Sequence, residues 1–196
     1  AKEFGILFVA DEVQSGMGRT GKMMAIEHWG VTPDIFALAK GIASGMPLGA
    51  MVSQSEVMDW VRGSHASTFG GNPISCQAGL TTIELLQEGL IENAGRMGEY
   101  LLSKLKDLQK RFRLIGDIRG KGLMIGIEIV RDLETKEKAI EERNRIIQTC
   151  FEKGLLLLGC GENVIRLSPA LIITQREADL ALTILEEVLK KVEAEV

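Results

Sequence analysis

The sequence has few cysteines and no excess of positive charge among its 196 residues. Its formal net charge is −4, which gives no electrostatic footprint for nucleic acid, so no nucleic-acid partner is expected. The three cysteines, Cys76, Cys150 and Cys160, show no CxxC spacing, and one of them stays unpaired in any disulfide scheme. Together with the lack of a secretory signal, this favours a reducing, cytoplasmic setting over a disulfide framework.

Long apolar runs, repeats and low-complexity tracts are also missing. No run reaches the roughly 20 residues that a membrane-spanning helix needs, so no membrane partner is expected. The first residue is Ala1, and an apolar strand pattern starts as early as Ile6, so we expect a fragment of a longer protein. The residue pattern changes after Gly89, which predicts two units, residues 1–89 and 90–196. The second is typical of a small α+β domain with helices covering a sheet.

Hydrophobic periodicity predicts the secondary structure of both units. The apolar run at 6–9 is typical of a strand buried on both faces, and it leads into Asp11 and Glu12. Thr174 followed by Glu177 is a capping box, which predicts a final helix reaching nearly to Ala194. The other expected strands are 34–39, 48–53, 123–130, 155–158 and 164–167, and the other expected helices are 22–29, 74–90, 92–109 and 136–153.

The glycine-rich segment 16–22 matches two phosphate-binding motifs, GxGxxG and GxxxxGK. The ATPase interpretation fails at Met23, where a P-loop needs Ser or Thr to ligate Mg²⁺. The dinucleotide interpretation is weak because Asp11 and Glu12 would repel a pyrophosphate at the end of the preceding strand. The acidic residue expected about twenty positions on has only Asp34 as a candidate. A glycine-rich turn without a ligand is the simpler alternative.

Two chemically important side chains stand at the ends of apolar stretches. Asp11 ends the first predicted strand, and Lys40 follows the stretch 35–39 and precedes a glycine. A lysine at such an edge would be partly desolvated, which makes its free amine more accessible. Taken singly, each residue has a simpler explanation. Asp11 could cap a turn, and the Lys40 side chain could extend to the surface. Together they are typical of pyridoxal phosphate chemistry, which needs an amine for the cofactor and an acid beside its ring nitrogen.

Several ordered blocks resemble the class III aminotransferase family. The stretch 11–21 is similar to that family's DEVQxGxGRTG block, and Asp11 and Lys40 are 40 − 11 = 29 residues apart, as the family pattern expects. The further blocks are Pro33-Asp34-Ile35 with Ala39-Lys40-Gly41, Pro47-Leu48-Gly49-Ala50, Ser67-Thr68-Phe69-Gly70-Gly71-Asn72-Pro73, and Ile118-Arg119-Gly120-Lys121-Gly122-Leu123-Met124. The resemblance implies an α/β fold, fold type I of the pyridoxal-phosphate-dependent transferases. Residues 1–89 would end its large mixed-sheet domain, and 90–196 would form the small one.

The resemblance also assigns roles to residues around pyridoxal 5'-phosphate, with no metal. Lys40 would be the Schiff-base lysine and would move the proton between substrate carbon and cofactor, and Asp11 would pair with the pyridinium nitrogen. Val13 would pack on the ring face and Gln14 would hydrogen-bond the ring hydroxyl; core packing and a turn position are their alternatives. Thr68, with Ser67 as a weaker candidate, would reach the phosphate in a neighbouring subunit, which implies a homodimer. The alternative for Thr68 is a cap for the helix near residue 74.

Arg166 resembles the family's late arginine, which binds the substrate carboxylate; its alternative is an exposed strand end. A planar guanidinium suits that bidentate contact. Pro169-Ala170 departs from the family's usual Pro-Pro pair, which bears on the local turn. Arg19 and Arg119 also lie in family-like blocks, and structural ion pairs explain them equally well.

The implied reaction moves an amino group between an amino acid or ω-amino acid, such as 4-aminobutyrate, ornithine or acetylornithine, and a 2-oxo acid. A racemase of the same family is the alternative reaction. A truncated, non-catalytic dimerisation fragment is the alternative of another class. The family's amino-terminal half supplies the phosphate loop and the aromatic residue stacked on the ring, so this chain alone is predicted to be inactive.

Overall fold

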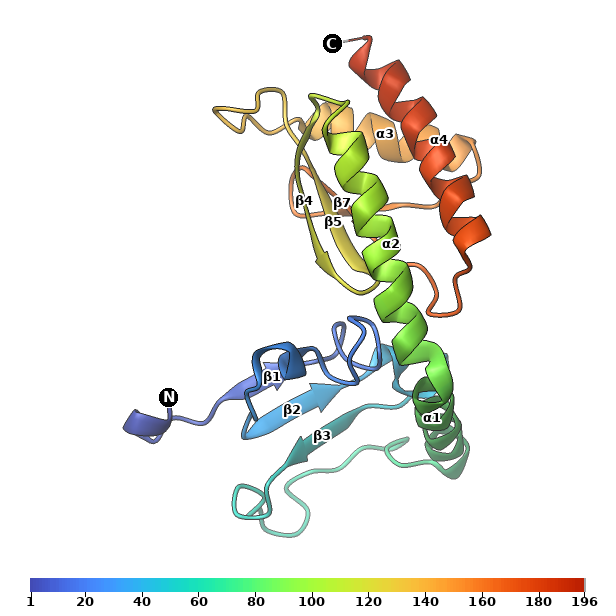
Figure 1. The fold of residues 1–196 in the computed structure, drawn as a ribbon. Helices are drawn as coiled ribbons and strands as arrows, with labels where there is room; N and C mark the ends of the chain where they lie inside the picture. The colour runs from blue at the N-terminus through green and yellow to red at the C-terminus, as the bar shows by residue number, and fades with distance from the viewer. Residues whose placement is uncertain (196) are drawn as a thin grey trace. The chain divides into compact units, whose positions relative to one another are not determined.

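The computed structural model describes residues 1–195. The chain divides into two compact units, Ala1–Glu92 and Asn93–Val196. Each unit has its own sheet (Figure 1). The first contains η1 (Lys2–Phe4), β1 (Val9–Asp11), η2 (Ala25–Trp29), β2 (Ile35–Leu38), η3 (Lys40–Ala43), β3 (Ala50–Ser53), α1 (Pro73–Leu85) and η4 (Leu86–Leu90). The second contains most of α2 (Ile91–Gln109), then β4 (Ile115–Lys121), β5 (Met124–Ile129), α3 (Ile140–Glu152), β6 (Leu158–Cys160), β7 (Val164–Leu167) and α4 (Gln175–Glu193).

The first sheet has the order β1-β2-β3, with β1 parallel and β3 antiparallel to the central strand. The predicted strands at 34–39 and 48–53 are confirmed as β2 and β3. The strand predicted at 6–9 is wrong in place and burial, because pairing begins only at Val9 and Ile6 is 61% exposed. Among the described residues β1 pairs with one strand, β2, and Val9 at its start is 55% exposed.

The start of helix α1 is set by a capping asparagine and a proline at the first helical position. Asn72 caps its first turn, with the backbone N–H of Ser75 donating to Asn72 Oδ1 at 2.9 Å, and Pro73 occupies the first helical position. The predicted helix 74–90 is confirmed in extent, but it is regular only to Leu85, and its last segment, η4, is kinked. Gly89, with φ of +143°, breaks the regular helix there, a conformation that only glycine adopts easily.

The second sheet is antiparallel throughout, in the order β4-β5-β7-β6. The central strands β5 and β7 alternate between a buried face, which carries Ile125, Ile127 and Ile165, and a half-buried face. The buried face packs with α2, α3 and α4 into a single apolar core. The strands predicted at 123–130 and 164–167 are therefore confirmed as β5 and β7.

Three predictions in this unit need correction. Strand β4 is missing from the predicted elements, because two glycines and the charged pair Asp117 and Arg119 interrupt its apolar alternation. The strand expected at 155–158 begins only at Leu158, and it is an exposed edge strand rather than a buried one. Helix α3 begins at Ile140 rather than at 136, because Lys136 has a positive φ of 57° in the preceding turn.

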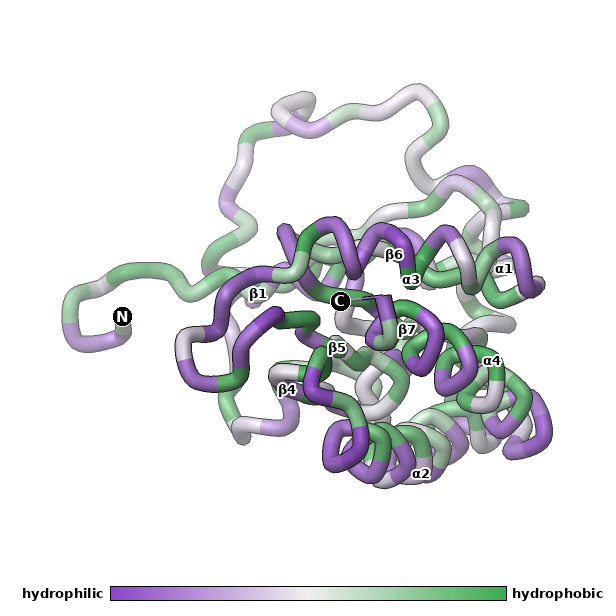
Figure 2. Tube along the Cα trace, turned by 90° about the horizontal axis from the view of Figure 1, so that it is seen from above, coloured by the Kyte–Doolittle hydropathy of each residue, from purple (hydrophilic) through white to green (hydrophobic). Residues whose placement is uncertain are grey.

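Helices α2 and α4 are amphipathic, with hydrophobic and hydrophilic residues alternating around each (Figure 2). The predicted capping box is confirmed at the start of α4. The Glu177 N–H donates to Thr174 Oγ1 at 3.3 Å, and the Thr174 N–H donates back to Glu177 Oε2 at 2.8 Å. Within residues 1–195, no helix is long and apolar enough to cross a membrane.

Gly98 of α2 stands directly against the turn between β4 and β5. A Cβ atom at position 98 would lie 2.3 Å from the carbonyl carbon of Gly122, far inside van der Waals contact. We expect Gly98→Ala to lower the free energy of unfolding by about 1–3 kcal/mol, the usual cost of overpacking. Ser103→Ala, at an exposed position of the same helix, is the matched control and should not lower it. Urea unfolding measures both, and a Gly98→Ala protein as stable as its parent would contradict the close contact.

Candidate functional site

The register of the first sheet brings Asp11 and Lys40 to the same edge. Strands β1 and β2 run parallel, and Asp11 is paired with Ala37. Lys40 follows Ala37 by three residues and is the first residue of η3. The carboxyl ends of parallel strands meet at one edge of a sheet, where open α/β sheets place their ligands. The two residues that the sequence singles out therefore leave neighbouring strands in the same direction.

Asp11 is exposed and held in place by its own turn. The backbone N–H of Val13 donates to Asp11 Oδ1 at 3.0 Å. This is the turn-capping contact that the simpler explanation of Asp11 predicts. This contact uses Oδ1 and does not involve Oδ2.

Lys40 has an unusual backbone conformation. Its φ is +50°, in the left-handed region, which costs a residue with a side chain about 1–2 kcal/mol. Such strain is concentrated at functional sites, where the surrounding structure holds it. The side chain is exposed in this chain, so the partial desolvation expected from the sequence is not found.

The glycine-rich loop packs closely under this edge rather than opening a helix. A Cβ atom on Gly16 would lie 2.8 Å from the Glu12 carbonyl oxygen, and one on Gly41 would lie 3.7 Å from Met17 Cβ. The loop therefore contacts the corner that carries Lys40. After Lys22 the chain bends into the five-residue 3-10 helix η2 instead of an α-helix. This geometry lacks the helix start on which both phosphate-loop interpretations depend.

Glu12 is the buried member of the acidic pair, at 3% exposure. Its Oε2 accepts a hydrogen bond from Ser15 Oγ at 2.5 Å, and its Oε1 accepts one from the backbone N–H of Ile26 at 2.7 Å. The sequence motifs assign Glu12 no role beyond repelling a phosphate. The available signal was a carboxylate directly after an apolar strand with a serine three residues later, a spacing that allows a local hydrogen bond.

The two residues expected to contact the cofactor ring lie in the turn after Asp11. Val13 is half-buried and Gln14 is exposed. Both are confined between Asp11 and Ser15, whose hydroxyl is bonded to Glu12. Their roles toward a ring remain predictions, but their backbone is fixed on both sides.

Thr68 and Ser67 lie in an exposed loop before α1. The alternative that Thr68 caps this helix is wrong, because Asn72 fills that position. A Cβ atom on Gly70 would lie 2.9 Å from Ser67 Cβ, so the loop folds tightly over Ser67. Thr68, next to Ser67, is exposed.

Arg166 belongs to the second unit and lies within β7, not at a strand end. It is half-buried, and its register partners are Gly126 on β5 and Leu158 on β6. Its Nε is buried and has no hydrogen-bond partner within residues 1–195. On the far side of Gly126, Arg119 is paired with Asp117 at 2.8 Å, so a structural ion pair does explain that arginine.

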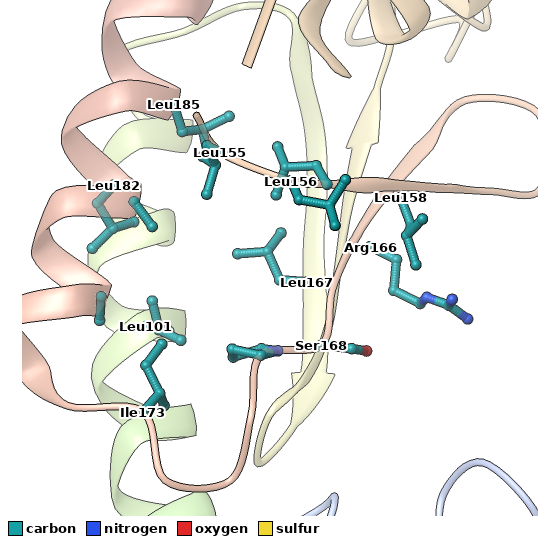
Figure 3. Close-up of a pocket in the computed structure, with 14 residues that line it drawn as sticks. Leu101, Leu155, Leu156, Leu158, Arg166, Leu167, Ser168, Ile173, Leu182 and Leu185 are labelled. Carbon is teal, nitrogen blue, oxygen red and sulfur yellow. The ribbon is translucent and has the colours of Figure 1, made fainter. Parts of the chain in front are cut away.

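An apolar cavity of about 200 Å³ lies between β7, α2 and α4. In Figure 3 the side chains of Leu155, Leu167 and Leu182 point into it, whereas the Arg166 guanidinium points away. The lining is almost wholly aliphatic, without the convergent polar groups that orient a small substrate. Neither Asp11 nor Lys40 contributes to it.

The chain is similar to proteins of one known family. The profile of the class-III aminotransferase family matches residues 1–189. The chain is 43% identical over 191 residues to an acetylornithine aminotransferase of Caldanaerobacter subterraneus, covering 97% of this chain and 46% of that protein. It is 44% identical over 193 residues to a leucine/methionine racemase of Thermococcus litoralis, covering 97% and 44%.

Solved structures of aminotransferases are also similar to this chain. A Bacillus anthracis aminotransferase superimposes with a TM-score of 0.92 at 36% identity, covering 97% of this chain and 46% of that one. A Plasmodium falciparum ornithine delta-aminotransferase gives 0.90 at 33% identity, covering 100% and 50%. The chain thus spans about half the length of the proteins it matches.

Proposed function

The chain belongs to the class III aminotransferase family, and on that premise we propose that the complete protein is an aminotransferase. It would move an amino group between an amino acid or ω-amino acid and a 2-oxo acid. The cofactor of this family is pyridoxal phosphate, which supplies an electron sink when bound. The observation that carries the proposal is the position of Asp11 and Lys40 at one edge of parallel strands.

The residues at this edge fit the cofactor. Lys40 would hold it covalently through its amine and would move a proton at the substrate carbon. Asp11, with Oδ1 already bound to the Val13 N–H, would present its other oxygen to the ring nitrogen and stabilise the protonated form. Val13 would contact the ring face, and Gln14 would donate to the ring hydroxyl.

Thr68 supports a homodimer with the cofactor site at the subunit interface. It is exposed in a loop and caps no helix, so its hydroxyl is available to a phosphate outside its own unit. Sedimentation equilibrium of the complete protein should give twice the mass of one chain. We also place the protein in the cytoplasm, in keeping with its three free cysteines.

Arg166 would bind the substrate carboxylate. Replacing it with glutamine removes a charge-assisted contact worth about 1.5–3 kcal/mol, so kcat/KM should fall about 10- to 100-fold, mainly through KM. Arg176→Gln, an exposed arginine of the same unit, is the control and should keep both constants. Steady-state kinetics with the carboxylate donor separate the two. An unchanged KM in Arg166→Gln would show that another group binds the carboxylate.

A donor screen tests the reaction itself. The complete protein with pyridoxal phosphate is offered acetylornithine, ornithine or 4-aminobutyrate together with a 2-oxo acid, and formation of the new amino acid is measured. The racemase alternative is favoured by the racemases among the relatives, and it is tested with one enantiomer and no oxo acid. Inversion of that enantiomer without amino transfer would overturn the aminotransferase assignment. The 196-residue chain alone, the fragment alternative, is expected to show neither activity.

A further inference from the structure

Glu12 is joined to three separate segments of the first unit. Its backbone N–H donates to the carbonyl of Ala37 on β2 at 3.1 Å, and its own carbonyl accepts from the Gly16 N–H at 3.0 Å. Its carboxylate reaches Ser15 at one oxygen and the Ile26 N–H at the other. Both side-chain oxygens therefore have partners inside the fold, and neither is presented to a ligand.

These contacts enclose the segment that carries the proposed cofactor contacts. Val13 and Gln14 lie between Glu12 and Ser15, so the bond from Ser15 to Glu12 closes a loop around them. The bond to Ile26 draws the far end of the glycine-rich loop back to the end of β1. Because Asp11 precedes Glu12 directly, movement of Glu12 would displace the Asp11 carboxylate as well.

We propose that Glu12 is a positioning residue for cofactor binding. This inference depends on the proposed function. Its buried carboxylate fixes Asp11 and Gln14 in relation to one another, and it does so by accepting two hydrogen bonds rather than by touching the cofactor. Residues that hold a site in its working geometry matter strongly, because a displacement of about 1 Å can cost about 100-fold in rate, and binding sites depend on the same support.

Two substitutions in the complete protein separate this role from simple stability. Glu12→Ala removes both contacts, and we expect pyridoxal phosphate to bind about tenfold or more weakly, with a shifted visible absorption band. Glu12→Gln has the same shape, so its oxygen can accept from Ile26 while its amide donates to the Ser15 hydroxyl. It should bind the cofactor as the parent does. Glu27→Ala is the matched control, since the Glu27 carboxylate accepts from the Met24 N–H in the same region and not from the segment around Asp11.

The measurement is titration of each apoprotein with pyridoxal phosphate, followed by its visible absorption. Glu12→Ala with the parent's affinity and band would overturn the proposal, and so would a Glu12→Gln as weak as the alanine variant. If Glu12→Ala does not fold, Ser15→Ala decides in the same assay, with weaker binding supporting the proposal and parental affinity overturning it. If the parent itself develops no band, the proposed function fails, which is a different result.

Discussion

Replacing Lys40 with alanine is expected to lower turnover of the complete protein by about 10⁴-fold. The substitution removes the amine that would hold the cofactor and also the group that would move the substrate proton. Because the left-handed φ of Lys40 is strained, alanine at this position does not make the backbone less favourable than before. The loss should therefore appear in kcat, while the melting temperature of the apoprotein should not fall.

Lys22→Ala is the matched control for this experiment. Lys22 is exposed and lies in the glycine-rich loop, at the position that a P-loop lysine would occupy. Parental turnover in this variant would separate the two lysines and would argue against the ATPase interpretation. Equal losses in both variants would show that Lys40 has no special role.

Asp11→Asn should have the second-largest effect. The neutral amide cannot stabilise a protonated ring nitrogen, and a nearby opposite charge shifts such a pKa by about 1–3 units. Protonation of the ring should therefore become about 10- to 1000-fold less favourable, with a similar fall in kcat. The Val13 N–H can still donate to the amide oxygen, so the turn should survive.

The test is kcat together with a pH titration of the bound cofactor's visible absorption. Glu84→Gln removes a carboxylate from an exposed position of the same unit and should change neither measurement. An Asp11→Asn protein with parental kcat and an unchanged titration would place some other group beside the ring.

Local pattern predicts the elements whose environment is set by nearby residues. Helix α4 was predictable because its capping box and its amphipathic repeat both depend only on residues of the helix and its N-cap. The edge strands β1 and β6 were less predictable, since the burial of their side chains depends on what lies beside them. Leu158 is apolar yet exposed on β6, and Ile6 is apolar yet outside β1. Strand β4 was missed because Gly116 and Gly120 fit close contacts rather than an alternating pattern.

The site was predictable in part, because some of its residues stand in recognisable local patterns. Asp11 and Lys40 each follow an apolar stretch, and the family-like blocks single out both residues. The role proposed for Glu12 could not be read from the sequence, because one of its partners is the backbone N–H of Ile26, 14 positions away. Only the folded loop shows that this carboxylate is buried and bonded at both oxygens.

The most direct test of the central claim is to find the lysine that carries the cofactor. The complete protein is loaded with pyridoxal phosphate, reduced with borohydride and digested, and the labelled peptide is identified by mass spectrometry. We expect the label on Lys40, with Asp11→Asn still labelled there but more weakly. A label on a different lysine of a fully loaded protein would contradict the account.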